Sequence, residues 1–315
     1  MCATLTDFLW QAEAAKHAVD SLLLRSAPLP EWKTMTFDAD GTLERRIREV
    51  VADWEPAVTS LQGFERSILI SAALGMSFNS HSPMEVRLQV ALYSLVIFLT
   101  DDCEIPAAAL DEFMHRFYSG RPQLHPVLDH MVEILHGMDE FFPPLAVKGI
   151  VQGTVDYMNV NAFEPHAEKL PLHPAALSYV TARRMKHGLA EPFLMFLFDK
   201  FNYPDVSTWV QAVPDMMIYT NWANDIYSFH KEILADDVHT YILERAEVTG
   251  KDLTETLSEI VDEAVVACDN VRKILKGTKA LEAWESFVAG YAAFHRYTPR
   301  YRLKELYGDE ERDRM

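Results

Sequence analysis

The distribution of prolines constrains this chain more than any other feature of its sequence. From about residue 57 onward, apolar residues recur with the period of an α-helix, and most prolines fall between the periodic segments. Only Pro214 lies inside such a segment, where we expect it to kink or split the helix. No proline follows it before Pro299, so long helices are permitted there. Strand-like alternation of polar and apolar residues is nearly absent, which predicts an all-α fold.

The expected helices come from these periodic segments. Residues 1–55 read as helical at the start and are then interrupted by Pro28 and Pro30. Nearly half of the 315 residues are hydrophobic, so the chain can bury a sizeable core. We therefore expect one α-helical domain over residues 1–315, in which residues 1–55 form the N-terminal segment. The predicted helices cover residues 57–77, 84–102, 107–118, 126–139, 145–162, 175–188, 191–201, 206–232, 252–276 and 280–296, with a short helix from residue 300.

The charge of the chain disfavours several classes of partner. Its formal net charge is −18, whereas nucleic acids and anionic membranes attract basic surfaces. An acidic protein can still bind an anion where metal ions or a local basic cluster reverse the sign. The most apolar run, "VALYSLVIFLT", is about half of a membrane span. The three cysteines show no CxxC spacing and the N-terminus has no secretory pattern, so we expect a cytoplasmic protein without a membrane span.

The segment "MTFDADGTL" at residues 35–43 resembles the opening motif of the haloacid-dehalogenase-like phosphatases, in which two aspartates follow a strand. That chemistry would require Asp38 and Asp40 at the tip of a parallel sheet. The strands of such a sheet are missing from the pattern. We therefore interpret the segment as a loop and a helix start near Glu44, with Asp40 or Thr42 as the N-cap.

The segment "NDIYSFHKE" at residues 224–232 carries oxygen-bearing side chains at a spacing of four. Because a helix turns by about 100° per residue, Asn224, Ser228 and Glu232 lie within about 80° of one another, whereas Asp225 falls off this stripe. Amide, hydroxyl and carboxylate oxygens are ligands for Mg²⁺, which keeps waters and shares phosphate oxygens. The alternative is a solvated helix face, and the spacing alone does not exclude it.

The segment "FLTDDCEIP" at residues 98–106 places a second acidic motif at the end of an apolar helix. Asp101 and Asp102 follow turns whose composition indicates burial. The alternative is a helix end that runs out into solvent. Because the helix macrodipole disfavours carboxylates at a C-terminal end, we expect a cationic group beside them.

Basic residues form a third set. Arg183 and Arg184 lie in "TARRMKHG", and Arg300 and Tyr301 lie in "TPRYRLKEL". In a chain with this surplus of negative charge, such groups could gather around a diphosphate. Taken singly, each arginine could equally be a solvated surface charge.

Together the three sets resemble the class I terpene cyclases, and in particular the fungal trichodiene synthase family, over roughly residues 60–307. The resemblance implies a helical bundle around a central apolar cavity. It implies a sesquiterpene synthase that uses Mg²⁺, usually three ions with Mn²⁺ as an alternative, to ionise and cyclise farnesyl diphosphate with release of diphosphate. The metal ligands that it implies are Asp101, Asp102, Asn224, Ser228 and Glu232. The diphosphate-binding residues that it implies are Arg183, Lys231, Arg300 and Tyr301.

The aspartate-rich motif departs from the family at its fifth place, which is Ile105. Whether Asp102 or Glu104 joins Asp101, or Asp101 acts nearly alone, is left open. Candidate cavity residues lie one or two turns below each motif or on a neighbouring helix, and ordinary core packing is the alternative for the aromatic ones. They are Ile97, Phe98, Tyr157, Met217, Thr220, Asn221 and Trp222. Polar residues such as Asn221 could position a water, so a cyclic hydrocarbon and an alcohol are both open as products.

Two alternatives to a sesquiterpene synthase are weighed. A chain-elongating prenyl transferase resembles this class but carries aspartate-rich motifs on both sides, so the Asn/Ser/Glu set argues against it. A non-catalytic isoprenoid-binding protein of the same fold would tend to lose its metal and basic sets. A homodimer is a further expectation that the sequence does not decide.

Overall fold

The computed structural model describes residues 5–27, 37–102 and 105–307. These residues form helices and contain no strand, so the predicted all-α fold is confirmed. The α-helices are α1 (Leu5–Ser26), α2 (Thr42–Val51), α3 (Pro56–Thr59), α4 (Phe64–Phe78), α5 (Met84–Asp102), α6 (Ala107–Ser119), α7 (Pro126–His136), α8 (Pro144–Ala167), α9 (Leu177–His187), α10 (Ala190–Met195), α11 (Val213–Leu234), α12 (Tyr241–Thr249), α13 (Leu253–Ile274) and α14 (Ala280–Tyr297). The 3₁₀ helices are η1 (Met138–Glu140), η2 (Val206–Thr208), η3 (Val210–Ala212), η4 (Pro299–Tyr301) and η5 (Leu303–Leu306).

Helices α5 and α11 are enclosed by the rest of the fold. Every residue of α5 from Val90 to Thr100 is buried, and so is every residue of α11 from Tyr219 to His230 except Asn224. A helix that is buried all round belongs to the core. Both predicted metal motifs therefore lie on helices whose positions are fixed by packing on all sides.

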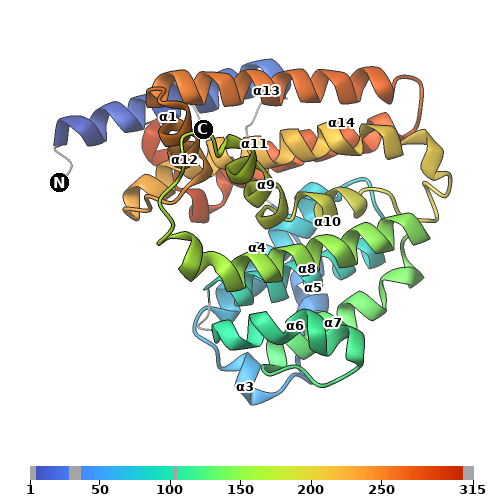
Figure 1. Cartoon of the computed structure of the whole chain (residues 1–315). Coiled ribbons are helices and arrows are strands. Elements are labelled where there is room, and N and C mark those ends of the chain that lie inside the picture. Colours follow the sequence, from blue (N-terminus) through green and yellow to red (C-terminus); the bar gives the residue numbers. More distant parts are fainter. Residues whose placement is uncertain (1–4, 28–36, 103–104, 308–315) are drawn as a thin grey trace.

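The other helices pack around these two. In Figure 1, α1 and α13 run side by side along one edge, with α11 and α14 next to them, and α6 and α7 lie at the opposite edge. Helix α11 contacts both α1 and α13, α14 contacts α4, and α8 contacts α6, α9 and α10. Within the described ranges, no helix is both long and apolar enough to cross a membrane.

Two predicted helices are divided in the structure. The segment 57–77 becomes α3 and α4, because Gly63 takes a positive φ of 91° and starts a new helix. The segment 206–232 becomes η2, η3 and α11, which confirms that Pro214 splits it. Pro214 lies in the first turn of α11, where its missing N–H costs nothing.

The helices predicted from the sequence do not include α12, and the predicted helix at α7 is too long. Thr240 caps α12 by accepting a hydrogen bond from the Leu243 N–H at 3.3 Å, and Gly250 follows the helix at a φ of 68°. Nine residues are too few for the helical period to stand out. The predicted helix 126–139 ends at His136 and is followed by η1.

The N-terminal part contains α1 and α2, and Pro28 and Pro30 lie outside the described residues. Asp38 accepts hydrogen bonds from the backbone N–H groups of Leu43 at 3.0 Å and Glu44 at 2.7 Å. Asp40 accepts one from the Thr42 N–H at 3.1 Å. Helix α2 begins two residues earlier than predicted, and its N-cap is Gly41, at a φ of 64°, rather than Asp40 or Thr42. Both aspartates satisfy free N–H groups at this helix start. No sheet adjoins them within the described chain, so the phosphatase interpretation lacks its structural basis.

A close approach between α4 and α14 shapes one side of the interior. A Cβ on Gly290 of α14 would lie 1.9 Å from the backbone oxygen of Ser77. The approach brings the rings of Tyr291 and Phe294 to centroid distances of 4.9 Å and 5.2 Å from Phe78. Glycine is therefore required where these aromatic side chains meet.

We predict that Gly290→Ala lowers the free energy of unfolding by about 1–3 kcal/mol, the range of overpacked interiors, because the backbone of Ser77 cannot move aside alone. Gly137→Ala is the matched control, since the nearest atom to a Cβ there is 3.7 Å away and its φ is −84°. Its stability should be unchanged or slightly higher. Thermal unfolding followed by circular dichroism measures both variants, and equal stabilities would contradict the predicted clash.

Candidate active site

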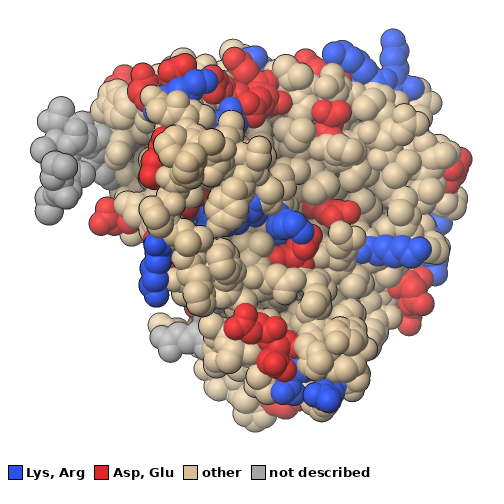
Figure 2. Space-filling model, viewed as in Figure 1, with Lys and Arg blue, Asp and Glu red and all other residues tan. Residues whose placement is uncertain are grey.

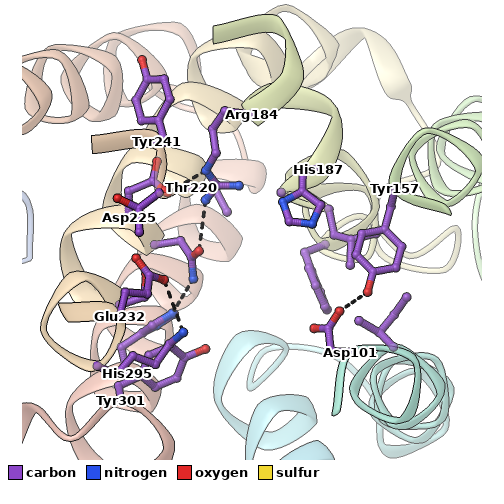
Figure 3. A pocket seen from close by; sticks show the side chains of 18 of the residues that line it. Asp101, Tyr157, Arg184, His187, Thr220, Asp225, Glu232, Tyr241, His295 and Tyr301 are labelled. Atoms are coloured by element: carbon purple, nitrogen blue, oxygen red, sulfur yellow. Dashed lines mark hydrogen bonds and ion pairs between the residues drawn. The ribbon is translucent and has the colours of Figure 1, made fainter. Parts of the chain in front are cut away.

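A cavity of about 290 Å³ lies between α5, α8, α9, α11 and α14. Figure 3 shows two of its sides, with Asp225, Glu232 and His295 facing Asp101 and Tyr157 across it. On the face drawn in Figure 2, basic and acidic side chains meet in a hollow near the middle. The apolar lining residues are Leu74, Phe78, Ile97, Phe98, Val160, Val180, Leu189, Phe193 and Phe294.

Asp101 lies at the end of α5 and lines this cavity. Tyr157 of α8 donates a hydrogen bond to its carboxylate. Loss of hydration on burial raises the pKa of Asp101. The hydrogen bond from Tyr157 and the positive charge of Arg300 oppose this shift of the pKa. A bound cation would favour the ionised carboxylate, because it would neutralise a charge that is poorly hydrated.

Asp102, also predicted as a metal ligand, is not among the residues that line the cavity. Its carboxylate accepts hydrogen bonds from Arg300 at 2.7 Å and Arg66 at 3.0 Å. These are the cations expected beside the C-terminal end of α5. Asp102 therefore anchors Arg300 in this structure, and Asp101 is the aspartate of α5 that lines the cavity. Glu104 lies outside the described residues.

Asn224, Ser228 and Glu232 all line the cavity from α11. The described ranges contain no group of three or more His, Cys, Asp or Glu residues that could hold a metal ion. The α11 set differs from such groups, since it combines one carboxylate with an amide and a hydroxyl. Oxygen donors of low total charge suit Mg²⁺ that shares a phosphate anion, whereas softer metals prefer nitrogen and sulfur. The residues present therefore fit Mg²⁺.

The basic residues predicted to bind diphosphate contact carboxylates. Arg183 donates to both oxygens of Glu244, and the Lys231 Nζ lies 3.3 Å from Glu232 Oε1. Burial raises the pKa of Glu244, and Arg183 opposes that shift. Tyr301 is buried in the lining, and burial raises its pKa to about 12, so its hydroxyl is a neutral donor near pH 7.

A buried network links α9, α11 and α14. The Arg184 Nε donates to Asp225 Oδ1 at 2.6 Å, and its Nη2 donates to Asn224 Oδ1 at 3.0 Å. Burial raises the pKa of Asp225, and the charge of Arg184 opposes this. The Asn224 Nδ2 lies 3.2 Å from the Nε2 of His295, whose pKa burial lowers to about 3. The sequence showed only that Asp225 leaves the stripe, and it gave no signal for His295.

Of the residues predicted for the cavity, Ile97, Phe98, Tyr157 and Thr220 lie in its lining, whereas Met217, Asn221 and Trp222 do not. The Asn221 Nδ2 donates to the backbone oxygen of Met217 at 3.1 Å and is buried inside the protein. Thr220 lies one helical turn before Asn224 and lines the cavity.

The sequence and the fold of this chain resemble those of known proteins. Residues 63–314 match the family model described as "Trichodiene synthase (TRI5)". "Terpene synthase 29" of Postia placenta is 34% identical over 272 residues, which is 86% of this chain and 79% of that protein. "Monoterpene synthase 25" of the same fungus is 32% identical over 277 residues, 87% of this chain and 82% of that protein. The crystal structure of a linalool/nerolidol synthase from Streptomyces clavuligerus in complex with 2-fluorogeranyl diphosphate superposes with a TM-score of 0.62 at 15% identity, over 87% of this chain and 98% of that one.

The all-α architecture and its structural likeness are those of the class I terpene synthases. The chain belongs to the trichodiene synthase family, because the family model covers most of its length and the relatives exceed 30% identity. The predicted family and fold class are therefore confirmed. The roles of the site residues, the single domain, the homodimer and the cytoplasmic location stay predictions.

We predict that Asp225→Asn lowers the free energy of unfolding by about 3 kcal/mol, because it leaves the buried guanidinium of Arg184 without its counter-charge. The control is Asp262→Asn, the same change in the exposed pair with Arg25, whose N–O distance is also 2.6 Å. Its cost should stay below about 1 kcal/mol. Urea unfolding measures both variants. If they lost equally little stability, the pair would not hold α9 against α11.

Proposed function

We propose that the protein is a Mg²⁺-dependent sesquiterpene synthase, which ionises farnesyl diphosphate, cyclises the hydrocarbon chain and releases diphosphate. One observation carries this proposal. Groups suited to a metal and a diphosphate share a single cavity with apolar and aromatic side chains. These groups are Asp101, Arg183, Asn224, Ser228, Lys231, Glu232, Arg300 and Tyr301.

Binding of the diphosphate would exchange partners at the basic residues. Arg183 now contacts Glu244, and Arg300 contacts Asp102. Both guanidinium groups can bind two phosphate oxygens through two parallel hydrogen bonds, as they can bind a carboxylate. The diphosphate carries more negative charge than the carboxylate that it would replace. The Tyr301 hydroxyl would donate a further hydrogen bond. The anion would thereby hold α9 and the segment after α14 against the end of α11.

The apolar part of the cavity would receive the isoprenoid chain. Mg²⁺ bound with the diphosphate would stabilise the negative charge that this group gains on leaving. The aromatic faces of Phe98, Tyr157 and Phe294 would stabilise the allylic cation without attacking it, and the enclosing walls would exclude bulk water. Thr220 Oγ1 is buried without a hydrogen-bond partner among the described residues, so both a cyclic hydrocarbon and an alcohol are compatible with this wall.

Geranyl diphosphate, which has a shorter isoprenoid chain, is a second candidate substrate. The name "Monoterpene synthase 25" of one relative favours geranyl diphosphate. The match to the trichodiene synthase family model favours farnesyl diphosphate, which the resemblance implies. A chain-elongating prenyl transferase is disfavoured, because α11 carries an Asn/Ser/Glu set where that class has a second aspartate-rich motif.

Gas chromatography of the products formed with Mg²⁺ tests the proposal directly. Purified protein is incubated with farnesyl diphosphate, with geranyl diphosphate, and with isopentenyl plus dimethylallyl diphosphate. We expect a cyclic sesquiterpene from the first substrate. Turnover of geranyl diphosphate alone would make it a monoterpene synthase, and elongated diphosphates would indicate a prenyl transferase. The absence of all these products would leave a non-catalytic isoprenoid-binding protein.

We predict that Glu232→Gln lowers turnover by at least about 100-fold, more than is typical of residues that only support a metal ligand, because it removes the one formal charge of the α11 set. Ser228→Ala should be milder and partly rescued by raised Mg²⁺. The measurement is steady-state turnover of farnesyl diphosphate across a Mg²⁺ titration.

The matched control for this series is Glu140→Gln, which changes an exposed glutamate outside the cavity lining. It should keep the turnover and the Mg²⁺ dependence of the wild type. Circular dichroism verifies that each variant is folded. Wild-type behaviour of both Glu232→Gln and Ser228→Ala would refute the metal assignment on α11.

A further inference from the structure

His295 lies on α14 and is buried, with 1% of its surface exposed. Its ring contacts Tyr291 of the same helix and Asn224 of α11. Its Nδ1 lies 2.8 Å from the backbone oxygen of Tyr291. A carbonyl oxygen only accepts, so Nδ1 carries the hydrogen of this bond. Its Nε2 lies 3.2 Å from the Nδ2 of Asn224, which is a donor. The ring is therefore the neutral tautomer with its lone pair turned toward the amide of Asn224.

The opposite end of the Asn224 amide meets Arg184. The Arg184 Nη2 donates to Asn224 Oδ1 at 3.0 Å, and Arg184 is itself held by Asp225. An amide rotated by 180° would turn its NH₂ group toward a guanidinium and its oxygen toward the lone pair of His295. Neither contact could form a hydrogen bond. The two neighbours consequently select the same orientation.

We propose that His295 is a positioning residue, which holds the amide of Asn224 with Oδ1 on the side of Arg184, so that this oxygen can ligate a divalent cation in place of the guanidinium. The inference rests on the proposed function, since it takes Asn224 as a metal ligand. Only the amide oxygen can ligate, because the lone pair of the nitrogen is delocalised. A metal ligand whose orientation is fixed by a second hydrogen bond binds more tightly than one that rotates freely.

Packing is the competing explanation for a buried histidine at this place. The ring lies 4.2 Å from the ring of Tyr301 and 4.4 Å from that of Tyr291, measured between centroids. Two substitutions separate the explanations. His295→Phe keeps an aromatic ring but removes the acceptor, whereas His295→Gln loses the ring but offers Oε1 as an acceptor to Asn224.

The experiment follows the thermal stabilisation of the full chain by inorganic diphosphate during a Mg²⁺ titration. This readout does not depend on turnover. We expect His295→Phe to raise the Mg²⁺ concentration for half-maximal stabilisation by about tenfold, as is typical when a residue that orients a ligand is lost. His295→Gln should remain close to the wild type in its Mg²⁺ requirement, even where its melting temperature is lower. The reverse order of the two variants would overturn the proposal in favour of packing.

The same His295 substitution is also made in a second variant, Asn224→Asp, so that the test does not depend on overall stability. In Asn224→Asp the side chain has two equivalent oxygens, so no orientation remains to be fixed. His295→Phe should then leave the Mg²⁺ requirement of Asn224→Asp unchanged. An equal loss in both backgrounds overturns the positioning role alone. The absence of any Mg²⁺-dependent stabilisation in the wild type, together with no turnover of isoprenoid diphosphates, would overturn the proposed function as well.

Discussion

The buried ion pair between Arg184 and Asp225 connects α9 to α11 beside the groups that line the cavity. Each charge alone would be costly at this depth, so the two helices are stable only in the register that brings them together. Arg184 also donates to Asn224, whose other end meets His295 of α14. The orientation of the Asn224 amide therefore depends on the relative positions of α9, α11 and α14. The position of a cation bound to this amide would depend on the same packing.

Ion pairs between basic residues and carboxylates also explain how an acidic protein can keep basic groups in a cavity, where they could bind an anion. The chain has a net charge of −18, yet Arg183, Lys231 and Arg300 line the cavity, each in contact with a carboxylate. An entering diphosphate competes with these carboxylates instead of meeting free cations. A bare anion would leave Glu244 and Glu232 close to new negative charge, whereas an anion that carries divalent cations would neutralise them. The site should therefore favour the metal complex of the diphosphate over the free anion.

The sequence by itself determined the helices and the place of each motif along them. Helical period and proline positions are local properties, so they predicted α5, α13 and α14 within about two residues of the observed ends. The spacing of four likewise places Asn224, Ser228 and Glu232 on one face whatever their neighbours are. Short elements carry weaker local signals, which is why α12 was missed.

Only the tertiary structure decided what each side chain faces. Asp101 and Asp102 are adjacent and chemically identical, yet one lines the cavity and the other binds two arginines, because α4 and η4 pack beside one of them. Thr220 lines the cavity, whereas the Nδ2 of the adjacent Asn221 donates to the sulfur of Met185 on α9. His295 reaches Asn224 across 71 residues of sequence. Contacts of this kind depend on how helices cross at interaxial distances of about 8–10 Å, and the period of a single helix contains no information about that crossing.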